Sequence, residues 1–67
     1  MSIAKVSEIS ATSGESFEDA LAQGIARAHK TLRNVRSAWI KEQHVRIRAG
    51  AIEEYQVNMM ITFVIDD

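Results

Sequence analysis

The chain has 67 residues with neither cysteine nor proline, and its eight basic and nine acidic residues leave a formal net charge of −1. This length predicts a single domain, residues 1–67, because a domain of this size buries only about 60% of the surface that its unfolded chain exposes. Without cysteine, disulfides and thiolate zinc sites are excluded, and self-association is the remaining means of stabilising so small a fold. The balanced charge disfavours a generic nucleic-acid binder. No apolar run is long enough to span a membrane and no signal-peptide core begins the chain, so we expect a soluble, cytoplasmic protein.

The first half of the chain predicts a strand, a loop and a helix. β-Branched residues recur over Ile3–Ala11, and the loop "ATSGES" follows. Ser16 is a good helix N-cap, with Asp19 three places on, near the capping-box spacing. Asn34 is the expected C-cap. The apolar positions between them form one helical stripe, in which Gly24 predicts a close approach to a sheet. They are Phe17, Ala20, Leu21, Gly24, Ile25, Ala28 and Leu32.

After the helix the apolar period changes from 3.6 to 2 and predicts a hairpin of two long strands. They span Val35–Arg48 and Ile52–Ile65, and Gly50 is the permissive residue of the turn between them. The fold class is therefore α+β, in the order β-α-β-β. Strands of this length reach roughly 45 Å, whereas the helix covers only about 25 Å. We expect the strands to be curved by a bulge and to complete their core against other copies of the chain.

Strand parity also predicts which polar side chains share a face. The alternation from Tyr55 to Ile65 assigns the Tyr55 side to the helix, so Gln56 points to the opposite side. The same parity places Trp39, the only tryptophan, on that side beside Gln56. Six side chains are expected to converge there: Ser37, Trp39, Lys41, Gln43, Gln56 and Asn58.

The chain resembles the dodecin family of small flavin-binding proteins. The resemblance runs from "AKVSEI" through "TSGESFEDAL", "ARAHKTLRNV" and "EEYQV" to "TFVI". The helix ending "A-x-A-x-x-T-L-R-N" and the strand segment "Y-Q-V" are specific when combined at this spacing. The resemblance implies a three-stranded antiparallel sheet wrapped around one helix, assembled as a hollow homo-dodecamer. It also implies a non-catalytic protein that sequesters a flavin, riboflavin or FMN, at subunit interfaces.

The resemblance further implies how each candidate residue would act. Gln56 matches the glutamine that hydrogen-bonds the flavin ring edge. Ser37 stands where typical members have the tryptophan that stacks on the ring. His44 and Val64 stand where typical members place arginines near the polar tail of the flavin. The cofactor-binding candidates are therefore Gln56, Trp39, Ser37 and His44, with Trp39 two places beyond the usual stacking position.

Each of these assignments has an alternative. Trp39 forms either a displaced stacking platform for a planar ligand or an anchor at a subunit interface. Gln56 reads a flavin edge or makes an amide bond between strands or subunits, and a lone strand histidine such as His44 commonly lies at a surface or interface.

The whole assembly has an alternative role as well. A shell that has lost flavin would serve as a structural assembly or hold a divalent ion between carboxylates of Glu53 and Glu54 or of Asp66 and Asp67. The sequence contains no arrangement of nucleophile, base and orienting group that predicts catalysis.

Overall fold

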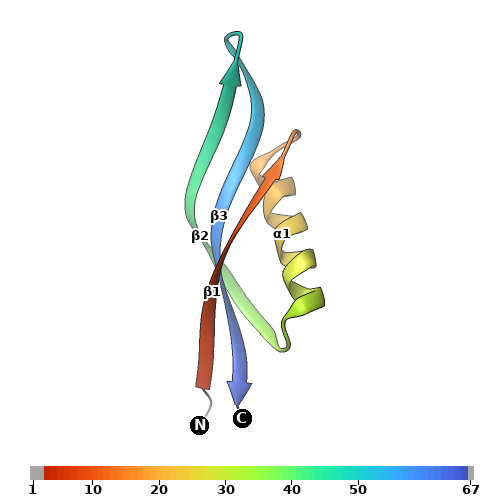
Figure 1. Ribbon diagram of the computed structural model, residues 1–67, viewed down its shortest axis with the longest axis vertical. Helices are drawn as coiled ribbons and strands as arrows, with labels where there is room; N and C mark the ends of the chain where they lie inside the picture. The colour runs from red at the N-terminus through yellow and green to blue at the C-terminus, as the bar shows by residue number, and fades with distance from the viewer. Residues whose placement is uncertain (1–2, 67) are drawn as a thin grey trace.

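The computed structural model describes residues 3–66 as three strands and one helix. The elements are β1 (Ile3–Ser13), α1 (Phe17–Thr31), β2 (Val35–Arg48) and β3 (Ala51–Asp66). The strands form one antiparallel sheet in the order β1-β3-β2, with α1 on one side of it (Figure 1). The predicted β-α-β-β order and α+β class are confirmed. The bounds of β2 agree with the sequence, whereas β1 runs two residues further and β3 is one residue longer at each end.

The start of α1 is fixed by side chains that follow β1 directly. Ser16 has an extended backbone, and its hydroxyl accepts a hydrogen bond of 2.9 Å from the backbone N–H of Asp19, as predicted for an N-cap. The Ser13 hydroxyl, at the end of β1, donates to the Asp19 carboxylate at 2.6 Å. One carboxylate therefore joins the end of the strand to the first turn of the helix, where negative charge is favoured.

The end of α1 differs from the prediction. The C-cap is Leu32, whose N–H donates to the carbonyl of Ala28 at 2.8 Å, so the assignment of Asn34 as the cap was wrong by two residues. Asn34 instead has φ of 56° and turns the chain into β2. Asparagine is one of the few side chains that adopts this left-handed conformation readily, so the residue marks the reversal of the loop rather than the end of the helix.

The core lies between α1 and the middle of β3. Val57, Met59 and Ile61 are fully buried, and Ala20 and Ala28 of the helix pack against them. The helix approaches most closely at Gly24, because a Cβ built there would lie 2.5 Å from the Met59 Cε atom. The predicted use of Gly24 is confirmed. At the N-terminal end of the helix, the Phe17 and Tyr55 rings pack edge to face with centroids 5.1 Å apart.

The hairpin of β2 and β3 extends well beyond the helix (Figure 1), as the strand lengths predicted. The molecule measures 51 × 19 × 13 Å. It exposes 4916 Å², compared with about 4,200 Å² for a typical compact monomer of this mass. Large apolar side chains near the hairpin tip contribute to this surface, with Ile47 65% and Ile52 51% exposed. One copy of the chain therefore leaves much of its apolar surface uncovered.

The hairpin turn consists of Ala49 and Gly50. Both have positive φ, 51° and 79° respectively. Positive φ at both central residues is the requirement of a type I′ turn, which suits the twist of the two flanking strands. The prediction that Gly50 serves the turn is confirmed, and Ala49 adopts the same conformation despite its Cβ.

Candidate functional site

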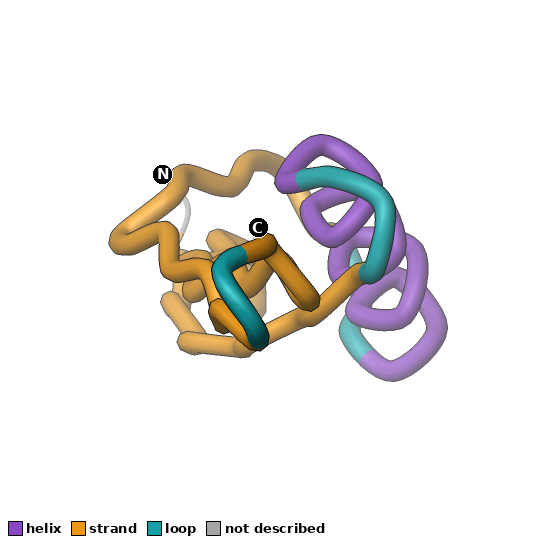
Figure 2. The backbone as a smooth tube through the Cα atoms, turned by 90° about the horizontal axis from the view of Figure 1, so that it is seen from above, coloured by secondary structure: helices purple, strands orange, loops and turns teal. Residues whose placement is uncertain are grey.

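The face of the sheet turned away from α1, hereafter the outer face, carries a row of polar side chains from all three strands. Figure 2 shows the helix lying to one side of the strands, which leaves this face uncovered within one chain. The register aligns the outward residues of β1, β3 and β2 in successive rows. The rows are Thr12–Gln56–His44, Ser10–Asn58–Glu42, Glu8–Met60–Trp39 and Val6–Thr62–Ser37.

A bulge at Lys41 determines which residues of β2 reach this face. The pairing with β3 shifts between Ile40 and Glu42, so Lys41 is an extra residue and the in–out alternation of β2 reverses after it. The predicted bulge is confirmed, but its position was not foreseen. As a result, the placement of Gln43 on the outer face was wrong: Gln43 pairs with Val57, whose side chain lies in the core.

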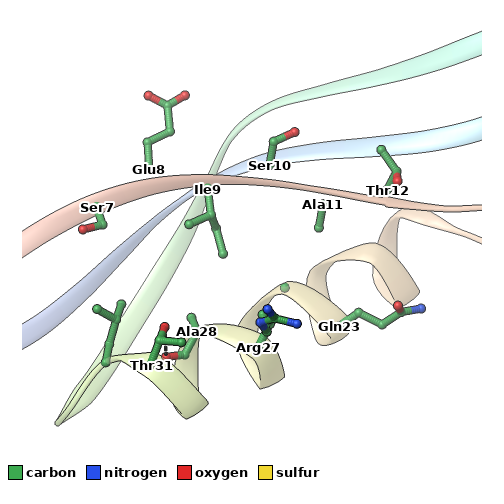
Figure 3. A pocket seen from close by; sticks show the side chains of 12 residues that line it. Ser7, Glu8, Ile9, Ser10, Ala11, Thr12, Gln23, Arg27, Ala28 and Thr31 are labelled. Atoms are coloured by element: carbon green, nitrogen blue, oxygen red, sulfur yellow. Dashed lines mark hydrogen bonds between the residues drawn. The ribbon is translucent and has the colours of Figure 1, made fainter.

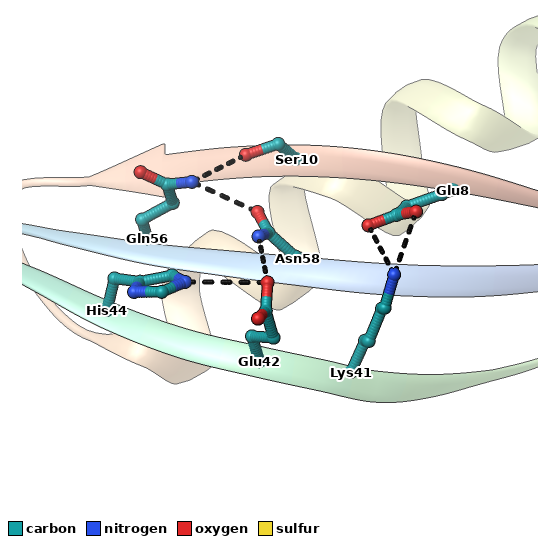
Figure 4. Close-up of polar contacts among 7 residues, drawn as sticks. All are labelled: Glu8, Ser10, Lys41, Glu42, His44, Gln56 and Asn58. Atoms are coloured by element: carbon teal, nitrogen blue, oxygen red, sulfur yellow. Dashed lines mark hydrogen bonds and ion pairs between the residues drawn. The ribbon is translucent and has the colours of Figure 1, made fainter.

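The same bulge brings His44 to the outer face, directly opposite Gln56. Their side chains belong to a continuous polar network, drawn in Figure 4. The Gln56 Nε2 group donates to Ser10 Oγ at 3.1 Å and to Asn58 Oδ1 at 3.0 Å. Asn58 Nδ2 donates in turn to Glu42 Oε1 at 2.8 Å, and His44 Nε2 lies 3.5 Å from the same oxygen.

The carboxylate of Glu42 is the anionic end of this network. The hydrogen bond from the Asn58 side chain, followed by that from His44, lowers the pKa of Glu42 below its ordinary value. Both donors stabilise the ionised form, which only accepts hydrogen bonds. Glu42 is therefore ionised at neutral pH.

Two further ion pairs cross the outer face beside the network. Lys41 Nζ lies 3.3 Å from Glu8 Oε1 across the sheet, and Arg46 Nη1 lies 3.7 Å from Glu54 Oε1. All four side chains are substantially exposed, so each pair contributes little to stability. Lys41 and Arg46 are thus each paired with a carboxylate of the same face.

Trp39 lies on the outer face, as predicted, and is 50% exposed. It stands opposite Met60, however, and not beside Gln56. These two rows are four positions apart on β3, which is about 13 Å along the strand. Ser37 is further away still, opposite Thr62, about 20 Å along β3 from Gln56. The expected convergence of Trp39 and Gln56 in one pocket does not occur within one chain.

Two grooves flank the helix on the other side of the sheet. One, of about 560 Å³, lies between β1 and α1, and its lining includes Ile9, Gln23 and Arg27 (Figure 3). The other, of about 600 Å³, lies between α1 and the start of β2, and Ser37 borders it from the edge strand although its row belongs to the outer face. Neither groove contains Gln56 or Trp39, so neither corresponds to the predicted ligand face.

Glu53 and Glu54, considered as ion ligands, each face an arginine. Glu53 lies 3.2 Å from Arg48 Nη1, and Glu54 faces Arg46. Among the side chains described, those of residues 3–65, no three histidine or acidic groups gather closely enough to hold a metal ion. The other candidate pair lies outside the described part of the chain, which includes neither Asp67 nor the side chain of Asp66. No helix over this same range is long and apolar enough to cross a membrane.

Sequence reasoning missed Glu42 and Ser10, two of the five members of the polar network. Both were assigned no role because strict alternation along β2 would turn Glu42 toward the helix, and Ser10 belongs to a strand with poor alternation. The position of the bulge was the missing information. A charged residue at an expected inward position, such as Glu42, is the one signal that could have indicated it.

Comparison with known proteins agrees with the resemblance seen in the sequence. The dodecin family model matches residues 3–66. A dodecin from Streptomyces davaonensis is 32% identical, with 98% of this chain and 97% of that chain covered and a TM-score of 0.92. A mutant of the Thermus thermophilus dodecin is 33% identical over 100% of both chains, again with a TM-score of 0.92. A dodecin from Streptomyces coelicolor, 23% identical over 98% of this chain and 94% of its own, has the same fold, with a TM-score of 0.92.

A search of curated proteins finds no match. The family model, however, covers nearly all of the chain, and the strands and helix superpose on those of dodecins from two genera over their full length. The chain therefore belongs to the dodecin family.

Proposed function

We propose that this protein assembles as a hollow homo-dodecamer and binds a flavin, riboflavin or FMN, at contacts between subunits on the outer face. It holds and shields the flavin without converting it to a product. The observation that carries this proposal is the outward-facing amide of Gln56, the family's edge-reading glutamine. Two neighbouring side chains, Ser10 and Asn58, hold it in place by hydrogen bonds on a face that one chain leaves open.

The uncovered apolar surface supports self-association. The exposed isoleucines of the hairpin lie beyond the reach of α1, where only another chain can cover them. Burying apolar side chains such as Ile47 and Ile52 stabilises an assembly by about 25 cal/mol for each Å² removed from water. A chain of 67 residues has few other means of supplying this stability.

The distances on the outer face support a site formed by more than one subunit. Within one chain, Trp39 stands about 13 Å from Gln56 along the sheet. This is too far for Trp39 to stack on the face of a ligand ring while Gln56 of the same chain hydrogen-bonds the edge of that ring. A ligand that touches both must therefore take Trp39 from one copy and Gln56 from another. Trp39 is half exposed, and stacking on such a ring contributes about 1–3 kcal/mol.

The other two candidates have lesser roles in this proposal. Ser37 leaves space where the typical stacking ring would stand, and the exposed Trp39 supplies the aromatic surface instead. His44, opposite Gln56, lies beside Glu42 and supplies a donor to the polar rim of the site. The protein is cytoplasmic in this account, and its only partners are further copies of itself and the planar ligand.

A second function is favoured by three substitutions. Ser37, His44 and Val64 replace the stacking ring and both basic residues that typical members direct at the ligand. In this alternative the shell persists as a structural or ion-binding assembly and has lost flavin. It predicts that flavin is not bound even though the protein assembles.

Titration of the purified protein with riboflavin and with FMN, followed by flavin fluorescence, separates the two functions. The flavin proposal predicts strong quenching that is lost in Trp39→Ala and in Gln56→Ala. The control is Lys30→Ala, which shortens an exposed side chain of α1, on the opposite side of the sheet from the outer face. Absence of quenching at tens of micromolar protein, with the assembly intact, would establish the alternative, and a titration with Mg²⁺ or Ca²⁺ would then test for an ion.

A further inference from the structure

The hydrogen bonds of Gln56 leave only its oxygen available to a ligand. A carboxamide nitrogen carries two hydrogens, and its oxygen accepts. Both hydrogens of Gln56 are directed at neighbouring acceptors, Ser10 Oγ at 3.1 Å and Asn58 Oδ1 at 3.0 Å. The carbonyl oxygen points away from the network in Figure 4. Gln56 therefore presents an acceptor, and not a donor, on the outer face.

The orientation of Gln56 is set two side chains away, at Glu42. An ionised carboxylate offers acceptors only, so Asn58 must direct its Nδ2 group toward Glu42, and the bond is 2.8 Å long. With its Nδ2 group directed at Glu42, Asn58 turns its Oδ1 atom toward Gln56. Because that oxygen only accepts, Gln56 must direct its Nε2 donor at it. Amide orientations are determined by such networks, and this one has a fixed direction because one end is an anion.

His44 reinforces the acceptor role of Glu42. Its Nε2 atom lies 3.5 Å from the same Oε1 that receives the Asn58 bond. The two donors hold the pKa of the Glu42 carboxyl below its usual range. The carboxylate thus remains an acceptor throughout the neutral pH range, and the direction of the network does not change there.

We propose that Glu42, acting through Asn58, is a positioning residue that fixes Gln56 as a hydrogen-bond acceptor, so that the outer face selects a planar ligand whose polar edge carries an N–H donor. The inference rests on the proposed function and extends it by naming the ligand chemistry. A neutral imide, in which an N–H stands between two carbonyls, meets the requirement. A ring whose edge offers acceptors only leaves the Gln56 oxygen unpaired against another acceptor.

Riboflavin and its N3-methyl derivative form a matched pair of probes. They have the same ring system, tail and charge, and they differ in the imide N–H that the methyl group replaces. The ratio of their dissociation constants therefore reports the donor requirement while effects on general affinity cancel. We expect the N3-methyl derivative to bind the wild-type assembly about tenfold more weakly, as is usual when a buried acceptor loses its donor.

Variants at position 42 test whether that ratio depends on Glu42. Glu42→Leu removes the acceptor and frees both amides to rotate, so the ratio should fall to about threefold or less. Glu42→Lys places a donor there, turns both amides over, and should lower the ratio further. The control is Glu8→Leu, which removes a carboxylate of the same face that pairs with Lys41 and lies outside the network. Its ratio should equal that of the wild type.

Each outcome bears on the inference separately from the proposed function. If riboflavin binds and the ratio is the same in wild type, Glu42→Leu and Glu42→Lys, Glu42 does not position Gln56 and the inference is wrong. A purely structural role for Glu42 gives that result, because it weakens both ligands equally. If neither probe binds the wild type, the proposed function fails and the inference falls with it. Should the variants at 42 not assemble, Asn58→Leu breaks the link between Glu42 and Gln56, and an unchanged ratio in that variant contradicts the inference equally well.

Discussion

Gln56 on β3 and His44 on β2 lie directly opposite each other on the outer face, and they do so because Lys41 is an extra residue in β2. Without the bulge, His44 would point toward the helix and Glu42 with it. The polar network of the proposed site thus depends on the register of β2, which shifts at Lys41 and also between Val35 and Ser37. Bulges of this kind commonly redirect side chains next to functional sites.

Deleting Lys41 should therefore disrupt the outer face more than removing its charge does. The deletion restores strict alternation and turns Glu42 and His44 toward α1, so we expect flavin quenching to be abolished and thermal stability to fall. Lys41→Ala removes the ion pair with Glu8 but keeps the bulge. Its melting temperature and quenching should stay close to those of the wild type. Equal effects of the two changes would argue against the role of the bulge.

Adding the ring that typical family members carry should strengthen binding. Ser37→Trp places a second aromatic side chain at the usual stacking position, and stacking contributes about 1–3 kcal/mol per ring. We expect the dissociation constant for riboflavin to fall by about fivefold or more. The comparison is Ser37→Leu, which adds apolar volume without an aromatic face. If both substitutions change the constant equally, the gain does not come from stacking.

A side chain at Gly24 should destabilise the fold despite improving the helix. Alanine is favoured over glycine in a helix by about 1 kcal/mol. Its Cβ, however, would lie 2.5 Å from the Met59 Cε atom and 3.2 Å from the Ala11 Cβ atom in a packed core, and such overpacking typically costs about 1–3 kcal/mol. We expect Gly24→Ala to lower the free energy of unfolding by about 1 kcal/mol in urea titrations. Gly14→Ala, where a Cβ meets open space, should cause no such loss.

A substitution in the hairpin turn should instead raise the free energy of unfolding. Ala49 has a φ of 51°, which is unfavourable for a residue with a Cβ. Ala49→Asn creates the asparagine–glycine pair that type I′ turns prefer. The free energy of unfolding should rise by about 0.5–1 kcal/mol. Ala51→Asn, one residue into β3, is the matched change in a strand and should lower stability.

The lowered pKa of Glu42 predicts a dependence of stability on acid. A carboxyl group whose pKa is lower in the folded state contributes stability above its unfolded value, near 4.5, and loses it as the pH falls through the folded value. The melting temperature of the wild type should therefore exceed that of Glu42→Gln at pH 7. The difference should shrink as the pH falls below 4.5 and disappear once the pH is below the lowered pKa of the folded state. Glu15→Gln, in the loop before α1, is the control. A difference that persists unchanged in acid would contradict the assigned hydrogen bonds.

The sequence predicted the elements well because each has a local cause. The Ser16 cap, the helical stripe with Gly24 and the alternation along β3 are readable from neighbouring residues alone. The outer face was predicted less well, since its composition depends on the register between β2 and β3. In the segment "IKEQH" the charge of Glu42 at an expected inward position is the one sign of a bulge, and it does not identify Lys41 as the extra residue, so Gln43 was assigned to the wrong face and Glu42 was overlooked.

Trp39 illustrates a second limit. Parity correctly put it on the same face as Gln56, but parity carries no information on distance along the sheet. The register places the two residues four positions apart on β3. Which copy of the chain supplies each side chain to a shared ligand is a property of the assembly, and a single sequence holds no direct signal of it.

Sedimentation of the protein in the presence of riboflavin, followed through the visible absorbance of the flavin, shows whether the assembled particle carries the ligand. Twelve chains of 7.5 kDa form a particle of about 90 kDa. We predict that flavin absorbance sediments with this particle and that Gln56→Ala leaves the flavin in the slow, unbound fraction while the particle persists. A wild-type particle that sediments without flavin would contradict the binding site, and protein that sediments as a monomer would contradict the assembly on which the site depends.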